Sequence, residues 1–157
     1  MRQKTFLLIV AVALIVTILG ETKTPIALAQ TSGTQTATAE VPFLTVEDLK
    51  ARMAKGEPIT IIDVRGSSDL HNGDNKIKGA IYVKLRKLKS RLAFPPLKDV
   101  PKDREIVAYC SCPNDEASIR AAQLLNESGF KRARVLKGGW VAWKRANGAV
   151  EPLSKVM

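Results

Sequence analysis

The feature that most constrains the fold is a pair of short, almost continuous apolar runs, PITIIDV at residues 58–64 and EIVAYC at residues 105–110. A strand with one solvated face alternates apolar and polar side chains, whereas runs like these indicate strands covered on both faces, as in a parallel sheet. Residues 81–83 and 134–136 are weaker strand candidates of the same kind. The chain therefore needs helices on both sides of a central sheet.

Helical patterns lie between these runs. The first begins at Thr45, which forms a capping box with Asp48, and ends at Gly56. A second apolar stripe begins at Ala117 and is ended by Gly129. Strands and helices therefore alternate along the chain, which predicts an α/β domain with a mainly parallel sheet.

The N-terminal segment has the pattern of an export signal. Arg2 and Lys4 precede an apolar stretch at residues 6–19, and ALA at residues 27–29 supplies a small-residue cleavage pattern. We therefore expect a signal peptide at residues 1–29 and an exported protein, periplasmic or secreted. An uncleaved membrane anchor is the alternative. The 157 residues then divide into this leader, a flexible linker (30–40), one domain (41–153) and a short tail (154–157).

The charge of the chain is strongly positive, with a formal net charge of +10. The densest basic segment, VKLRKLKSRL at residues 83–92, places Leu85, Leu88 and Leu92 on one helical face and its charges elsewhere. Such an excess favours anionic partners, from small sulfur oxyanions to a membrane surface, although a solvated basic surface is the simpler interpretation. No aromatic residues interleave with the basic ones, so nucleic acid is not an expected partner.

The segment YCSCPNDEAS at residues 109–118 contains the only two cysteines, Cys110 and Cys112. It connects a strand to a helix, and the free N–H groups and dipole of the helix N-terminus favour a thiolate there. Two buried apolar side chains, a redox dithiol and a metal site are the alternatives, the last lacking further ligands. The negative carboxylates of Asp115 and Glu116 would disfavour a thiolate in this loop. Alternatively, they cap the following helix and interact favourably with its dipole.

Three motifs together resemble the rhodanese-like domain family: IIDVRGSSDLHNGDNKIKGAIYV (residues 61–83), IVAYC (106–110) and VLKGGWVAWKRANGAVEP (135–152). The resemblance implies a five-stranded, mainly parallel sheet flanked by helices, with the active cysteine cradled by a loop at a helix N-terminus. In this family the cysteine takes sulfur from thiosulfate or a similar donor as a persulfide and passes it to cyanide or a thiol. No metal or organic cofactor is expected.

The position of the active cysteine is ambiguous, because the family's usual loop is Cys-x-x-Gly-x-Arg-Ser. Counting backward from Ser118 selects Cys112, whereas counting forward from the strand selects Cys110. We assign Cys110 as the nucleophile because Tyr109 places it at the strand end, and because the loop resembles the Tyr-Cys-x-Cys-Pro loop of a subset of exported rhodanese-like domains. Cys112 is then an assisting or resolving thiol.

The arginine that related phosphatases use to bind phosphate is absent. Six positions beyond Cys110 and Cys112 stand Glu116 and Ser118, so phosphatase and arsenate-reductase chemistry are not expected. A weak thiosulfate site is implied unless another cation contributes, for which the candidates are Arg65, Arg120 and Lys137.

Other residues are assigned supporting roles. The backbone of the active loop is expected to hold the persulfide or the substrate oxyanion, through Ser111, Pro113, Asn114, Asp115, Glu116 and Ala117. The candidate pocket wall consists of Asp63, Arg65, Arg120, Gly138, Gly139 and Trp140. The simpler interpretation of Asp63 and Arg65 is a structural ion pair. Trp140 is more simply a core-packing residue, and His71 is more simply a solvated loop residue. A non-catalytic or dithiol redox binding module remains the alternative function.

Overall fold

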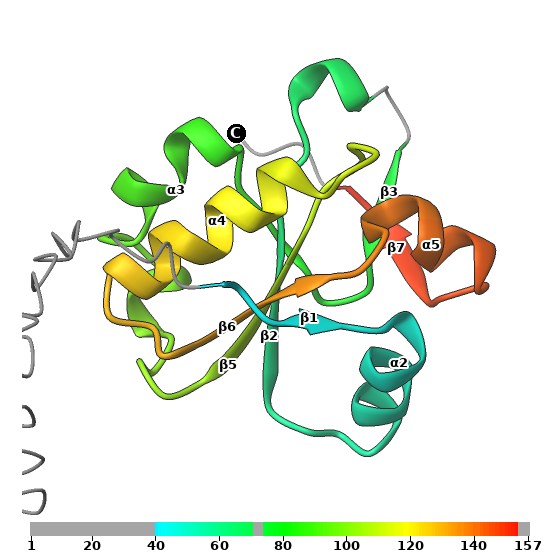
Figure 1. Cartoon of the computed structure of the whole chain (residues 1–157), viewed down its shortest axis with the longest axis horizontal. Coiled ribbons are helices and arrows are strands. Elements are labelled where there is room, and N and C mark those ends of the chain that lie inside the picture. The colour runs from blue at the N-terminus through cyan, green and yellow to red at the C-terminus, as the bar shows by residue number, and fades with distance from the viewer. Residues whose placement is uncertain (1–39, 71–73, 154–157) are drawn as a thin grey trace, which may run out of the picture. The chain divides into compact units, whose positions relative to one another are not determined.

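The computed structural model describes residues 40–70 and 74–153. These residues form a central sheet of five parallel strands in the order β1–β6–β5–β2–β4. Figure 1 labels β1, β6, β5 and β2 of this sheet. The α/β prediction with a mainly parallel five-stranded sheet is confirmed. The strands of this sheet are β1 (Phe43–Leu44), β2 (Ile59–Asp63), β4 (Ile81–Tyr82), β5 (Glu105–Tyr109) and β6 (Arg132–Leu136).

Strand β5 lies at the centre of the sheet, between β2 and β6, and all five of its residues are buried. This burial on both faces is the physical reason for its continuous apolar sequence. In the parallel register Asp63, the last residue of β2, lies beside Tyr109, the last residue of β5. The carboxyl ends of the two strands therefore meet at one edge of the sheet, where the cysteine segment begins.

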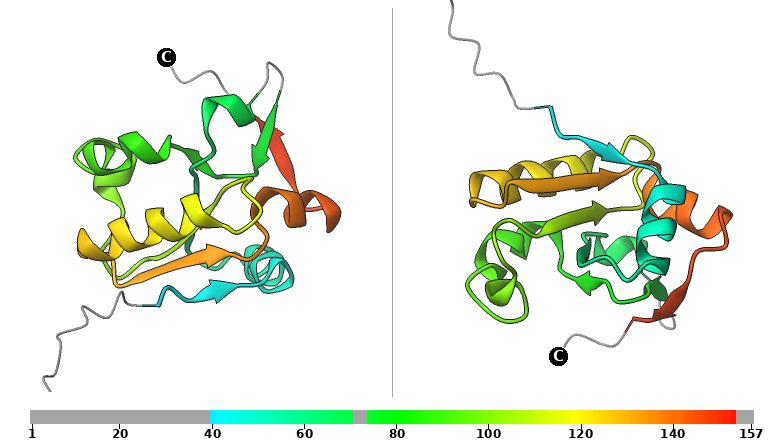
Figure 2. Two further views of the ribbon diagram at one scale, coloured as in Figure 1. Left: turned by 45° about the horizontal axis from the view of Figure 1, so that its top comes forward. Right: turned by 90° about the horizontal axis from the view of Figure 1, so that it is seen from below.

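Helices cover both faces of the sheet, with α3 and α4 on one side and α2 and α5 on the other (Figure 2). Alternate strand residues face the two layers, so that Ile62 and Ile106 pack toward α4 while Ile61 and Val107 pack the other way. The helices are α2 (Val46–Ala54), α3 (Leu85–Arg91), α4 (Glu116–Glu127) and α5 (Gly139–Arg145), with single 3-10 turns η2 (Ser67–Asp69) and η3 (Leu97–Asp99).

The ends of the helices follow the predicted signals. The Asp48 backbone N–H donates to Thr45 Oγ1 over 3.1 Å, and the Thr45 hydroxyl donates to the Asp48 carboxylate over 2.8 Å. Beyond α2 and α4, Gly56 and Gly129 adopt φ values of +69° and +90°, which favour glycine. Local side-chain chemistry thus sets these boundaries. The N-cap role of Thr45 is confirmed, but the Asp48 carboxylate bonds the Thr45 hydroxyl rather than its backbone N–H, so the predicted capping box is formed only in part.

A second, two-stranded antiparallel sheet was not predicted. It pairs β3 (Asn75–Ile77) with β7 (Val150–Pro152), and neither segment is long enough to show a strand pattern. The side chain of Lys76 is buried between them, where its ammonium donates to the Ala80 carbonyl over 2.6 Å and pairs with Glu151. Strand β7 thereby holds the C-terminal segment of the domain against residues 75–80.

Several predictions concern residues that the structure does not describe. The leader at residues 1–29, all but the last residue of the linker at 30–40, the tail at 154–157 and His71 lie outside the described residues. Among the described residues, no helix combines the length and the apolar character that crossing a membrane requires.

The Lys76–Glu151 pair generates a pH prediction. The hydrogen bond from Lys76 lowers the pKa of Glu151 below its ordinary value, so the folded state favours the carboxylate. The ion pair therefore adds to the unfolding free energy when the pH is above the pKa of Glu151 in the unfolded chain, about 4.3. This contribution is lost as the pH falls through the lower pKa of Glu151 in the folded protein. The difference in unfolding free energy between wild type and Glu151→Gln should therefore be positive at pH 7 and shrink on acidification, measured by urea denaturation.

The matched control is Glu127→Gln, because Glu127 is exposed on α4 and forms no ion pair within the described part of the chain. This control should show a smaller difference at every pH. A Glu151→Gln difference that stays constant between neutral and acidic pH would contradict the assigned role of the pair.

Candidate functional site

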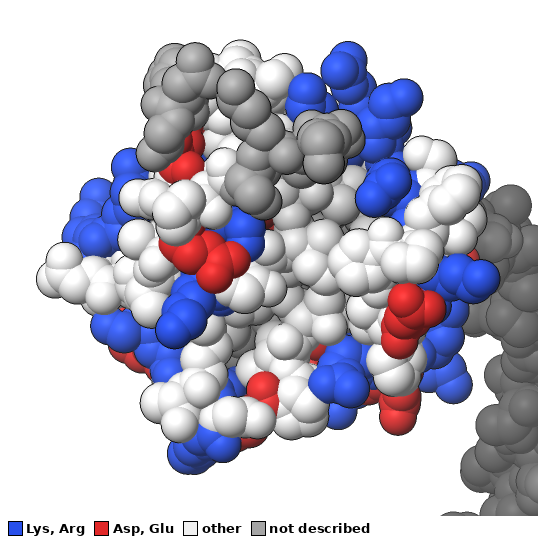
Figure 3. Space-filling model, turned by 180° about the vertical axis from the view of Figure 1, so that it is seen from behind, with Lys and Arg blue, Asp and Glu red and all other residues white. Residues whose placement is uncertain are grey.

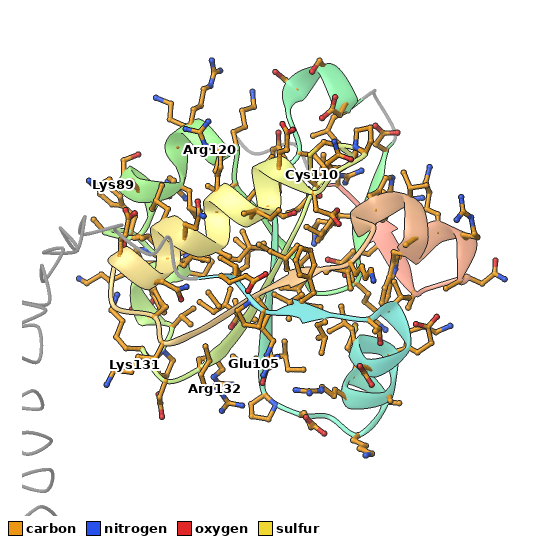
Figure 4. The ribbon with its side chains drawn as sticks, in the orientation of Figure 1. Lys89, Glu105, Cys110, Arg120, Lys131 and Arg132 are labelled. Atoms are coloured by element: carbon orange, nitrogen blue, oxygen red, sulfur yellow. A yellow bond between two sulfur atoms is a disulfide. The ribbon has the colours of Figure 1, made fainter. Side chains whose placement is uncertain are left out.

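The cysteine segment forms a loop at the carboxyl edge of the sheet. It leaves β5 after Tyr109, passes through Cys110 and Cys112, and enters α4 at Glu116. Figure 4 shows Cys110 near the start of α4. First-turn N–H groups of a helix lack intrahelical partners and point out of its N-terminal end, so those of α4 face the loop. The loop therefore occupies the place that the sequence predicts for it.

Cys110 and Cys112 are joined by a disulfide bond, with their Cα atoms 5.7 Å apart. The two residues differ in exposure: Cys110 is 2% exposed, whereas Cys112 is partly exposed. A disulfide sulfur carries no free thiolate, so nucleophilic chemistry at this loop requires that the pair first be reduced. In the oxidised form the outer side chain of the pair is that of Cys112.

A buried hydroxyl lies beside the inner sulfur. Ser118 Oγ is 3.6 Å from Cys110 Sγ and donates to the Asp115 carbonyl over 2.8 Å. Rotation of this hydroxyl in the reduced protein would offer a hydrogen bond to a Cys110 thiolate. Sequence reasoning used Ser118 only to count loop length. The signal that could have revealed it is the spacing of three from Asp115, at which a first-turn serine bonds back to the helix start.

Asp115 ties the loop to the start of α5. It is the N-cap residue of α4 and adopts a left-handed backbone with φ 55°, but its side chain makes no capping hydrogen bond. Instead Asp115 Oδ2 accepts from the Gly138 N–H over 2.8 Å, while Oδ1 is buried and has no hydrogen-bond partner among residues 40–70 and 74–153. The alternative that this carboxylate caps α4 is therefore wrong, because the side chain turns across to the neighbouring loop.

The Gly138–Gly139 pair permits a close approach of α5 to the loop. The two residues adopt φ values of +71° and +48°, and a Cβ on Gly139 would collide with the Cys110 carbonyl oxygen. That carbonyl accepts a hydrogen bond from the Trp140 N–H over 2.8 Å. The prediction that these glycines serve positive φ and close packing beside the loop is confirmed.

Beneath the loop lies a buried ion pair. The Asp63 carboxylate accepts from Arg65 Nη2 over 2.6 Å and from the Tyr109 hydroxyl over 2.8 Å, and both charged residues are at most 1% exposed. Arg65 also donates to the Asn75 carbonyl, and its guanidinium lies 4.3 Å from the centre of the Trp140 ring. These contacts join the ends of β2 and β5 to β3 and α5.

The electrostatics of this pair agree with a structural role. Burial alone would lower the pKa of Arg65, but the hydrogen bond and the negative charge of Asp63 outweigh burial and raise it. Burial, with the neighbouring Asp63 charge, raises the pKa of Tyr109 far above its ordinary value. Arg65 therefore stays cationic and Tyr109 stays a neutral donor at every physiological pH. Asp63, Arg65 and the largely buried Trp140 form a framework under the loop.

The candidate cations Arg120 and Lys137 line depressions that contain neither cysteine. Arg120 is exposed and lines a groove between α3 and α4, and Lys137 lines a separate depression with Thr45. Throughout the described ranges, no basic side chain donates a hydrogen bond to either cysteine, and no three metal-ligating side chains cluster. Within the described residues, Ser118 is thus the polar side chain that the structure brings to a cysteine sulfur, and the predicted backbone cradle stays a prediction.

Comparison with known proteins gives a consistent picture. The sequence model of the rhodanese-like domain family matches residues 45–146 of this chain. A sulfurtransferase of Allochromatium vinosum is 29% identical over 99 residues, which cover 63% of this chain and 84% of that protein. The crystal structure of Alr3790 from Anabaena is 34% identical, with a TM-score of 0.60 over 72% of this chain and 84% of that one. The human single-domain sulfurtransferase TSTD1, at 23% identity, shares the fold with a TM-score of 0.56, over 67% of this chain and 96% of that one.

The buried ion pair generates a stability prediction. Arg65→Met removes the cation and leaves the Asp63 carboxylate buried without its charge partner, which should cost about 3–5 kcal/mol of unfolding free energy. Urea denaturation of the variant and the wild type measures this loss. The double variant Asp63→Asn with Arg65→Met should recover part of it, since no charge is then left uncompensated. A single-variant loss below about 1 kcal/mol, typical of an exposed pair, would contradict the framework role.

Ser118 generates a second prediction, on reactivity. In the reduced protein, with Cys112→Ser to isolate one thiol, Ser118→Ala should slow alkylation of Cys110 by iodoacetamide at neutral pH about three- to tenfold. The reason is that a thiolate loses a charge-assisted hydrogen bond. The matched control is Ser111→Ala, a partly exposed serine of the same loop. Equal rates for the two serine variants would show that Ser118 does not support the thiolate.

Proposed function

Because this chain belongs to the rhodanese-like domain family, we propose that it is a rhodanese-type sulfurtransferase that carries sulfur as a cysteine persulfide. The observation that carries the proposal is the cysteine pair in the loop that leads into the N-terminus of α4. Sulfurtransferase relatives such as that of Allochromatium vinosum support it. Thiosulfate or a donor with a similarly labile outer sulfur is the proposed substrate, and a thiol or cyanide is the proposed acceptor.

The reaction runs in two displacements after a dithiol reductant has opened the disulfide. A protein thiolate attacks the outer sulfur of thiosulfate, a new S–S bond forms, and the old one breaks with its electron pair leaving on sulfite. An acceptor thiolate or cyanide then attacks the outer sulfur of the persulfide, and the protein thiolate leaves. Both steps need a stabilised sulfur anion, which loop N–H groups and the α4 dipole favour.

Exposure bears on which sulfur reacts first. The sequence assigns the nucleophile to Cys110, but Cys110 is 2% exposed and lies under its partner. A donor arriving from solution meets the partly exposed Cys112 first, and Cys112 also stands at the family's usual distance from Ser118. These two points favour Cys112 as the sulfur acceptor, with Cys110 as the inner, assisting or resolving thiol.

A second function is favoured by one observation, the Cys110–Cys112 disulfide itself. A pair of thiols that closes reversibly can exchange electrons with other dithiols without forming a persulfide. The predicted export of the chain agrees with either function, since disulfides persist outside the cytoplasm. A retained leader would anchor the domain to a membrane. Dithiol–disulfide exchange is therefore the rival that the experiment must separate from sulfur transfer.

The test is to load the reduced protein with thiosulfate and weigh it by mass spectrometry. We expect the wild type and Cys110→Ser to gain one sulfur atom and Cys112→Ser to gain little, because the outer thiol is then missing. Sulfur retained by Cys112→Ser but not by Cys110→Ser would restore the assignment to Cys110. The double cysteine variant is the control for adventitious sulfur.

If neither single variant gains sulfur and the wild type reversibly oxidises a small dithiol, the redox function is supported and sulfur transfer is refuted. Absence of both activities would leave only a binding module. Both assays use the same purified protein. Far-UV circular dichroism before the assays shows whether each variant is folded, so that a loss of activity is not mistaken for a loss of folding.

A further inference from the structure

A groove between α3 and α4 lies outside the cysteine site and has no role in the chemistry described above. Its volume is about 500 Å³. Helix α3 contributes one wall and α4 the other, with apolar side chains from both helices and charged groups around them. The lining residues are Leu85, Arg86, Lys89, Arg120, Gln123, Leu124 and Glu127.

The charges of this groove are mostly positive and uncompensated. Arg86, Lys89 and Arg120 are exposed, and within the described residues none of them forms an ion pair. The surrounding segment strengthens the field, since residues 75–98 contain eight basic residues and no acidic one. Basic side chains also outnumber acidic ones on the face that Figure 3 shows. An anionic partner would meet little local competition here.

The charges of α3 are not all placed to stabilise it: Lys89 lies in the last turn, where a cation is favourable, but Arg86 and the neighbouring Lys84 lie at the N-terminal end. Lys84 is its N-cap residue and makes no side-chain capping hydrogen bond, and the first turn has no acidic residue. Positive charge at a helix N-terminus opposes the helix dipole, so Lys84 and Arg86 are unfavourably placed for the helix itself.

The α4 wall of the groove begins about one turn beyond the cysteine loop. Helix α4 begins at Glu116, directly after the loop, and Arg120 lies about one turn further on. Cys112, Leu85 and Leu124 pack against the same core cluster. Figure 4 places Lys89 on α3 and Arg120 on α4, with Cys110 beyond the start of α4. A chain lying in the groove would therefore have to extend past Arg120, by about one turn of α4, to reach the cysteine loop.

We propose that the α3–α4 groove binds an acidic polypeptide segment of the sulfur acceptor and directs its thiol to the cysteine loop. The proposal rests on the sulfurtransferase function and adds the class of acceptor, a protein rather than a small thiol alone. Helix α4 is about 18 Å long, which an extended segment of about five residues spans. Carboxylates of that segment pair with the three cations, while an apolar residue contacts Leu85 and Leu124.

The shape and composition of the groove favour this occupant over two others. A groove between two helices suits a chain, whereas a flat anionic membrane would contact the ridges beside it. Nucleic-acid binding draws on aromatic side chains for base stacking, and none lines the groove. Glu127, near the end of α4, would repel a uniformly anionic surface but leaves room for a segment that is acidic only over part of its length.

The test measures binding and transfer separately, with the full-length protein. A fluorescent peptide of four glutamates and a terminal serine should bind more tightly than its four-glutamine counterpart at low ionic strength, by anisotropy. Arg86→Gln with Lys89→Gln should weaken that binding about five- to tenfold. The matched control is Lys55→Gln with Arg145→Gln, two exposed cations at the C-terminal ends of α2 and α5, the helices on the opposite face of the sheet. It should change binding less than twofold.

With a terminal cysteine in place of serine, the glutamate peptide should take sulfur from the loaded protein faster than the glutamine peptide, and the groove variant should lose this advantage. Equal weakening by both double variants would overturn the proposal, because net charge would then explain the binding. Preferential binding of anionic lipid vesicles through Arg86 and Lys89, without peptide preference, would also overturn it. Groove-dependent peptide binding in a protein that never forms a persulfide would support the surface and refute the sulfur transfer.

Discussion

The hydrogen bonds that converge on the buried Asp63 carboxylate hold the carboxyl edge of the sheet together. They come from Arg65 and from the Tyr109 hydroxyl, so one charged group fixes the ends of both β2 and β5. Removing one partner of such a pair lowers the unfolding free energy by far more than the intact pair adds to it, because the remaining buried charge has no compensating charge. The strand end that precedes Cys110 is therefore held in one place. A reactive loop needs such a rigid base for its sulfur to meet fixed N–H groups.

The cysteine loop is held from its other side by α5. The Cys110 carbonyl accepts from Trp140, and the Asp115 carboxylate accepts from Gly138, so the loop is bonded to the segment after β6 at two points. This close approach depends on glycine at position 139, where a Cβ would collide with the loop backbone. The Gly-Gly-Trp motif thus acts through geometry, as a positioning element for the thiols, rather than through its own chemistry.

Sequence reasoning succeeded where one short segment contains its own cause. The continuous apolar runs of β2 and β5, the Thr45–Asp48 cap of α2 and the terminal glycines are all local patterns, and each has its expected place. It failed for β3 and β7, which are three residues each and pair across more than seventy positions of sequence. It also misjudged Asp115, whose side chain bonds to Gly138 instead of its own helix, because a tertiary partner outcompeted the local cap.

The sequence by itself determined the fold class, the family and the place of the two thiols at a helix N-terminus, because periodicity and motif order are properties of the chain alone. Only the tertiary structure decided that Cys110 is inner and Cys112 outer, that Ser118 adjoins the inner sulfur, and that Arg65 is buried. It alone joined the basic residues of α3 to Arg120 of α4 in one groove. Burial and the pairing of distant side chains depend on how elements pack, and no single segment of the chain records that packing.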